Sequence, residues 1–232
     1  MIPHFVKEAA SHLRLFTYKG YMGLFWYLLD SFLLFLTFIF LRNVVTLSDI
    51  EFYALYLFVG ISMFNFFRRA TTQSMHAIRQ AHKKKEKDSL LTCIYRASVP
   101  VTHVAMMHSL ELVLVVVILL YYKISLVGII LYAPFLILLV MIFMCIAGVL
   151  LYFRFYWSNI TQLWMLLLRM LFFVTPIFYS TKFLLINHIN PIFYMVDTGR
   201  SLLISKDITT AISVTITALI LGVSMKLVKR VQ

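Results

Sequence analysis

Three ionisable residues, Asp30, Glu111 and Arg169, stand inside stretches that are otherwise apolar. Each lies about nine residues, or roughly 14 Å of helical rise, from the inner end of its stretch, near the midplane of a bilayer. A lone charge at that depth costs about 2.5–3.5 kcal/mol on insertion scales. We therefore expect one or both acids to pair with Arg169. Such pairs either hold helices around a translocation path or act as structural polar contacts between packed helices.

The sequence offers no motif for catalysis or for nucleotide binding. It contains neither a G-x-x-x-x-G-K-[ST] phosphate loop nor a G-x-G-x-x-G turn among its seven glycines. Its seven histidines lack metal-ligand spacing, because His103 and His108 are poorly placed on a helix to share a ligand. We expect no catalytic residue, no metal and no cofactor held by this chain, and an enzyme is not favoured.

The composition is typical of an integral membrane protein. Hydrophobic residues make up 62% of the 232 residues and charged residues 13%, whereas about a quarter of a soluble domain is charged. A helical span takes about 20 apolar residues, so the chain has room for six spans with short loops. We predict an all-α integral membrane protein with a single transmembrane domain over residues 1–232.

The segment at residues 68–96 fixes the expected orientation. It is rich in Lys and Arg and has no long apolar run, so the positive-inside rule places it in the cytoplasm. In a six-span arrangement most of the 21 Lys and Arg fall on that same side. The net charge of +12 is then a topology signal rather than a sign of nucleic-acid binding. Both termini are expected in the cytoplasm.

Six apolar stretches are the predicted transmembrane helices. They cover roughly residues 21–41, 52–67, 101–122, 124–153, 160–178 and 209–227. The fourth is long and contains Pro134, so we expect tilt or a break there, and Pro176 is expected to break the fifth. Residues 1–19 have helical apolar spacing and predict an interfacial helix. Residues 180–207 are external but too apolar for a free loop, which predicts short or re-entrant helices.

Several stretches resemble the permease subunits of type-2 ABC transporters that export polysaccharides and teichoic acids. The similar segments are residues 23–30 (GLFWYLLD), 60–74 (GISMFNFFRRATTQS) and 175–180 (TPIFYS), followed by Asn190-Pro191 and Arg200. Their order covers nearly the whole chain. The sequence departs from the family where Ser31 replaces a usual proline, and where Phe155 rather than Asp follows Arg154.

The resemblance implies the membrane subunit of an exporter in the prokaryotic plasma membrane, moving a lipid-linked polysaccharide or teichoic-acid-like polymer outward. Two copies would pair as a homodimer and bind two ATP-binding cassette ATPase subunits, which carry ATP and Mg. Residues 68–98 would form the cytoplasmic coupling loop. Its expected contact residues are Thr71, Gln73, His76, Arg79, Lys83, Lys84, Lys85 and Lys87. Without a partner, the same basic segment would lie on anionic lipid as a topology signal.

The resemblance also implies a path and an outer gate. Aromatic faces stack on sugar rings without reading a fixed sequence, which suits a sliding polymer. The candidate path aromatics are Trp26, Tyr27, Phe172, Phe173, Phe178 and Tyr179. The candidate gate residues within 180–207 and its approach are Pro176, Asn190, Pro191 and Arg200. For each aromatic, a lipid-facing or core position is the alternative. Other functions left open are export of a smaller lipid or drug, a membrane-bound enzyme of lipid chemistry, and a membrane scaffold without transport.

Overall fold

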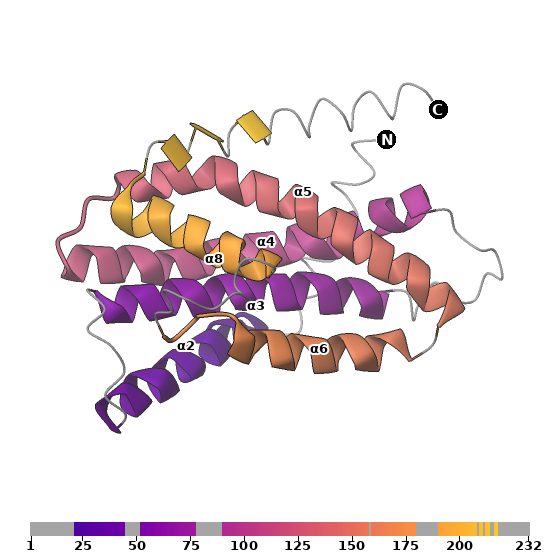
Figure 1. Ribbon diagram of the computed structural model, residues 1–232, viewed down its shortest axis with the longest axis horizontal. Helices are drawn as coiled ribbons and strands as arrows, with labels where there is room; N and C mark the ends of the chain where they lie inside the picture. The colour runs from indigo at the N-terminus through magenta and orange to yellow at the C-terminus, as the bar shows by residue number, and fades with distance from the viewer. Residues whose placement is uncertain are drawn as a thin grey trace.

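The structure is a computed structural model that describes residues 21–44, 52–77, 90–157, 159–179 and 190–207, with residues 209–210, 212–213 and 216–217 beyond them. Every regular element in these ranges is a helix (Figure 1). Three helices are long and apolar enough to cross a membrane, at Phe25–Arg42, Thr92–Tyr121 and Val127–Arg154. The described part is therefore all-helical, as predicted, with helices suited to a membrane.

Helices occupy the first five of the predicted stretches. The elements are α2 (Tyr21–Val44), α3 (Tyr53–Ala77), α4 (Leu90–Tyr121), α5 (Val127–Tyr156), α6 (Ile160–Val174), α8 (Pro191–Arg200) and the π-helix η2 (Ser201–Ser205). The helices α3 and α4 extend beyond their predicted stretches on the side of the basic segment. The interfacial helix predicted over residues 1–19 lies outside the described residues, as does most of the sixth stretch.

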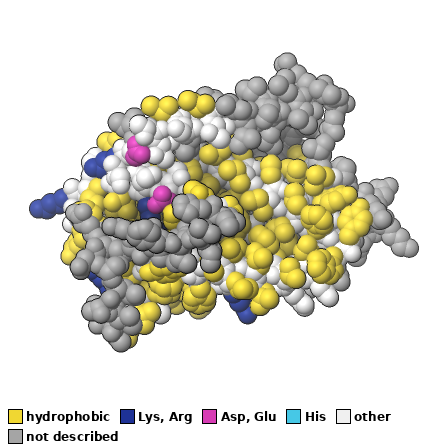
Figure 2. Space-filling model, in the orientation of Figure 1, with side chains coloured by type: hydrophobic (Ala, Val, Ile, Leu, Met, Phe, Trp, Pro, Cys, Tyr) yellow, Lys and Arg dark blue, Asp and Glu magenta, His cyan; other side chains and the backbone are white. Residues whose placement is uncertain are grey.

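The outer faces of the long helices are apolar. Exposed large side chains include Phe40 on α2, Val117 on α4, Ile137 on α5 and Met170 on α6. Figure 2 shows hydrophobic side chains over most of the described part of one face. A soluble monomer rarely leaves so large an apolar surface in water, and helices that contact lipid tails need one.

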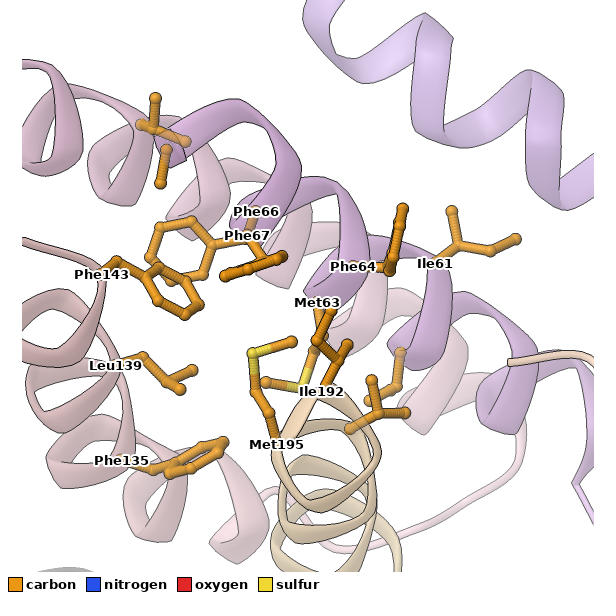
Figure 3. Close-up of a cluster of buried hydrophobic side chains, with 14 of the residues drawn as sticks. Ile61, Met63, Phe64, Phe66, Phe67, Phe135, Leu139, Phe143, Ile192 and Met195 are labelled. Carbon is orange, nitrogen blue, oxygen red and sulfur yellow. The ribbon is translucent and has the colours of Figure 1, made fainter. Parts of the chain in front are cut away.

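Helix α3 is the centre of the fold. It packs against α2, α4, α5, α6 and α8, and Figure 1 shows it running between α6 on one side and α4, α5 and α8 on the other. Every residue over 57–67 is buried. Figure 3 shows Met63 lying beside Met195 of α8, and Phe66 and Phe67 facing Phe143 of α5. A helix enclosed in this way has no face toward lipid and can carry polar side chains.

This enclosure explains why α3 is longer than predicted. The second stretch was expected to end at Phe67 and to be followed by the basic loop. Instead α3 continues through Ala77, and Thr71, Ser74 and Met75 are fully buried in it. Residues 90–98 belong to α4, so the predicted loop over 68–98 is helical at both of its ends.

The two prolines expected to interrupt helices behave differently. α6 ends at Val174 and Thr175 is extended, so the predicted break at Pro176 is confirmed. The break or tilt expected at Pro134 is not seen as an interruption, because α5 runs unbroken past it. Tyr132 and Phe135 are buried on either side of Pro134, and such packing holds a helix together where one N–H is missing.

Gly128 is expected to be essential for the contact between α5 and η2. A Cβ at Gly128 would lie 2.7 Å from the carbonyl oxygen of Leu202 and 2.8 Å from that of Leu203. Gly128→Val should therefore lower the free energy of unfolding by about 1–3 kcal/mol, measured as the thermal unfolding midpoint in detergent. The control is Ile130→Val on the exposed face of α5. Equal midpoints for the two variants would contradict this close contact.

Candidate polar network and cavity

Glu111 of α4 is fully buried and lies at the centre of a polar network. Its Oε1 accepts hydrogen bonds from Ser31 Oγ at 2.6 Å and from Arg69 Nη1 at 3.1 Å. Its Oε2 accepts one from Ser62 Oγ at 2.5 Å and lies 3.3 Å from His108 Nδ1. A buried carboxylate is tolerated only when it is paired and hydrogen-bonded, and these four partners meet that need.

Arg69 of α3 joins Glu111 to the second acid. Its Nη2 donates to Asp30 Oδ2 at 2.8 Å and to the Tyr27 carbonyl oxygen at 2.9 Å. The guanidinium carbon also lies 3.6 Å from the centroid of the Tyr27 ring. Arg68 Nη2 donates to the same Asp30 oxygen at 2.6 Å, in a more exposed pair. The network thus ties α2, α3 and α4 together at the level of Arg69.

The expected pairing with Arg169 is wrong. Asp30 pairs with Arg68 and Arg69, and Glu111 pairs with Arg69. Arg169 is exposed on α6, and the described residues give it no ion pair. The correction follows from the length of α3. Because that helix continues past Phe67, it brings Arg69 beside the two acids from a segment that was expected to be a loop.

The network reaches α5 through His108. His108 Nε2 lies 2.8 Å from the Tyr132 hydroxyl, and the histidine ring stacks on Phe66 with 4.6 Å between ring centroids. Asn65 Nδ2 adds a hydrogen bond to Ser31 Oγ at 2.9 Å. His108 is thus a buried residue that both packs against Phe66 and belongs to the polar network.

The members of the network on α3 were not predicted from the sequence, although a signal for them exists. Ser62, Asn65 and Arg69 are spaced three and four residues apart and share one face of α3. A polar stripe of this kind in an apolar helix predicts a buried polar contact.

A cavity of about 430 Å³ lies beside the network, between α2, α3 and α6. The polar part of its lining comes from Asn65, Arg68, Arg69, Thr72 and His76 of α3 and from Arg169 of α6. The apolar part comes from Leu34 of α2, Phe64 of α3, and Met165, Leu168, Phe172 and Phe173 of α6. Its volume is in the range of small-molecule pockets.

Arg200, at the end of α8, holds the turn that follows α6. Its Nη1 donates to the Pro176 carbonyl at 2.8 Å and its Nη2 to the Ile177 carbonyl at 2.7 Å. Its Nε donates to the carbonyl oxygen of Tyr56 on α3 at 3.1 Å, and the guanidinium lies 3.4 Å from the centroid of the Tyr56 ring. Arg200 is buried, so one side chain fixes the relative positions of α3, α8 and this turn.

Asn190 joins the same turn to the start of α8. Its Nδ2 donates to Thr175 Oγ1 at 2.9 Å, and its Oδ1 accepts from the Ile192 N–H at 3.0 Å. Asn190 is therefore the N-cap of α8, with Pro191 in the first turn. The structure thus brings the four predicted gate residues together around the turn that begins at Thr175.

The candidate path aromatics fall into two groups rather than one surface. Ring contacts with centroids 4.9–6.4 Å apart connect one group in the order Phe173, Phe172, Phe178 and Tyr179. Trp26 is exposed on α2, whereas Tyr27 is buried beneath Arg69. These two neighbours therefore differ in burial, and Tyr27 is a buried member of the network.

The coupling residues are described only in part. Arg79, Lys83, Lys84, Lys85 and Lys87 lie outside the described residues. Thr71 is fully buried and accepts a hydrogen bond from Trp164 Nε1 of α6 at 3.1 Å, so it joins two helices instead of facing a partner. Gln73 is half-buried, and His76 is exposed and lines the cavity.

Comparison with known proteins assigns no family to the chain. No protein-family model matches the sequence, and no curated protein matches it significantly. Within the described residues, no group of three His, Cys, Asp or Glu is placed to hold a metal ion. The part of the chain that the structure describes is all-helical and contains three helices suited to spanning a membrane.

Proposed function

We propose that this chain is the membrane subunit of an ATP-driven exporter of a lipid-linked polysaccharide or teichoic-acid-like polymer. The basis is the resemblance of residues 60–74 and 175–180 to type-2 ABC permeases. The apolar helices support a transport role. Because the sequence has no phosphate-binding loop, ATP and Mg would be bound by a separate ATPase subunit, with two such subunits serving a homodimer of this chain in a prokaryotic plasma membrane.

The observation that carries the proposal is the continuity of α3. The helix is unbroken from Tyr53 to Ala77 and includes the first part of the basic segment at residues 68–96. Arg69 lies about 12 Å of helical rise before Ala77, where its carboxylate partners belong to α2 and α4. Near the opposite end, the Tyr56 carbonyl accepts from Arg200. One rigid element therefore connects the basic segment, the buried charges and the turn after α6.

This arrangement supports a simple coupling mechanism. Closure of the ATPase would displace the segment after Ala77, and α3 would move as a unit. The contacts of Arg69 would pass the movement to α2 and α4, and those of Arg200 would pass it to α8. The aromatic group from Phe172 to Tyr179 lies beside the cavity and the turn, where it would contact sugar rings.

Purification of the tagged chain from its native membrane tests the proposal first. An ATPase with Walker motifs should copurify, and its absence would contradict an ATP-driven exporter and favour a membrane scaffold. Deletion of the gene should abolish surface polysaccharide if the substrate is a polymer, but not if it is a smaller lipid or drug. Export of a smaller lipid or drug is a second candidate function, because the cavity has the volume of a small-molecule site.

Charge reversal in the basic segment is expected to uncouple the ATPase. Arg79→Glu combined with Lys84→Glu should abolish stimulation of the partner's ATP hydrolysis, because the segment would meet its partner with the wrong charge. Circular dichroism should show the same helical content as in the unmodified protein. Lys123→Glu, an exposed change in the turn between α4 and α5, is the matched control. Unaltered stimulation in the double variant would place the coupling site elsewhere.

A further inference from the structure

Arg169 is the unexplained charge of this structure. It lies in the apolar helix α6, about nine residues or roughly 14 Å from its start. Its side chain is exposed, and the described residues provide no ion pair for it. An arginine in a membrane segment is costly unless it is paired, and it marks a functional site by default. Arg169 does not point to empty surface, because it lines the cavity between α2, α3 and α6.

The charges around that cavity do not cancel. Three guanidinium groups line it, from Arg68, Arg69 and Arg169. The two carboxylates nearby, Asp30 and Glu111, bind Arg68 and Arg69 and do not themselves line the cavity. Two negative charges thus offset two positive ones, and the charge of Arg169 remains. The charged part of the lining is therefore complementary to an anion.

The rest of the lining has a different chemistry. Leu34, Phe64, Leu168, Phe172 and Phe173 line the same cavity with apolar side chains. A small inorganic anion would leave this surface in contact with water, whereas an alkyl chain would cover it. An anionic headgroup attached to a hydrocarbon chain would both pair with the arginines and cover the apolar lining.

We propose that this cavity binds the phosphate headgroup and the first methylene groups of a lipid. Arg169 is the principal partner of the phosphate, and Arg68 approaches it from α3. Phosphate suits the site because the planar guanidinium fork matches two of its oxygens, and further oxygens remain for a second arginine. Phe172 and Phe173 contact the hydrocarbon chain of the lipid. The cavity would hold the lipid end of the exported substrate, an extension that rests on the proposed function.

The test measures equilibrium binding to the full chain purified in an uncharged detergent, with the number of bound ligands per chain determined by native mass spectrometry. The probe is dodecyl phosphate, compared with dodecanol, dodecanoate and inorganic phosphate. We expect dodecyl phosphate to occupy one site per chain about tenfold or more tightly than each comparator. If dodecanol binds equally well, the site is an apolar groove that does not recognise the phosphate. If inorganic phosphate binds equally well, the site is an ion site, and if dodecanoate does, it does not distinguish phosphate from carboxylate. Each of these results would overturn the proposal.

Variants assign the site to the cavity. Arg169→Gln should weaken dodecyl phosphate by about tenfold, the loss expected for one charge-assisted pair, and leave dodecanol unchanged. Arg169→Lys should recover part of the loss, and Lys123→Gln should bind as the unmodified protein does. Unchanged binding by Arg169→Gln would overturn the proposal. If the ATPase copurifies but dodecyl phosphate does not bind, the lipid site is refuted and the exporter function is not. If dodecyl phosphate binds but no ATPase copurifies, the exporter function is refuted and the lipid site is not.

Discussion

Replacing Arg69 by methionine is expected to lower the free energy of unfolding by about 3–5 kcal/mol, because it leaves a buried carboxylate without its cation. Glu111 is fully buried, and Arg69 is the arginine that contacts it. Most domains are stable by only about 5–15 kcal/mol, so the variant should accumulate poorly. The measurement is thermal unfolding in detergent, with size-exclusion chromatography as the check for folded protein.

Two further variants show whether charge is the cause. Arg68→Met removes only the more exposed contact with Asp30 and should cost less than about 1 kcal/mol. Arg69→Met combined with Glu111→Gln should be more stable than Arg69→Met alone, because a neutral amide can stay buried. Its oxygen can accept from one of Ser31 and Ser62, and its NH2 can donate to the hydroxyl oxygen of the other. If the double variant is no better than the single one, an uncompensated charge is not the reason for the loss.

The sequence predicts those parts of the fold that depend on local signals. Apolar length marks the helices, and Pro176 marks the end of α6, because both act within a few residues of themselves. The grouping of Asn190, Pro191 and Arg200 near Pro176 followed from a resemblance, and the structure supplies its physical reason. Arg200 and Asn190 bind the backbone and side chains of the turn that Pro176 creates.

The misplaced boundary of α3 has a different cause. Hydropathy detects helices that face lipid, whereas α3 packs against α2, α4, α5, α6 and α8 and is buried throughout residues 57–67. Its polar residues therefore lower its hydropathy without ending the helix. Arg69 was assigned to the cytoplasm for this reason, and the true partner of Glu111 was missed. Pairing by depth alone favoured Arg169, because depth does not specify toward which neighbour each helix turns its side chain.

The second large effect is expected at Arg200. Arg200→Met should lower the free energy of unfolding by about 2–4 kcal/mol, because it removes the guanidinium hydrogen bonds to the carbonyl oxygens of Tyr56, Pro176 and Ile177. Gly60 makes room for this guanidinium, since a Cβ there would lie 2.5 Å from Arg200 Nη2. Gly60→Ala should therefore give a smaller loss of the same kind. Thermal unfolding midpoints in detergent measure both.

Controls separate geometry from charge at this position. Arg200→Lys keeps the positive charge but cannot reach three separate carbonyl oxygens in the fixed directions of a guanidinium, so it should be intermediate. Arg42→Met removes a cation that lies 4.4 Å from the centroid of the Tyr53 ring and should cost less than about 1 kcal/mol. If Arg200→Met loses no more stability than Arg42→Met, the three hydrogen bonds do not hold the turn.

Function should respond to Arg200→Met differently from Arg79→Glu with Lys84→Glu. Arg200 contacts the end of α3 that is far from the basic segment, so the partner ATPase should still bind and still be stimulated. Export should be lost, because α8 and the turn at Pro176 would no longer follow α3. A transport assay beside an ATPase assay on the same membranes resolves the two effects. Parallel loss of both activities would show that Arg200 serves the stability of the whole subunit rather than the outer end of the path.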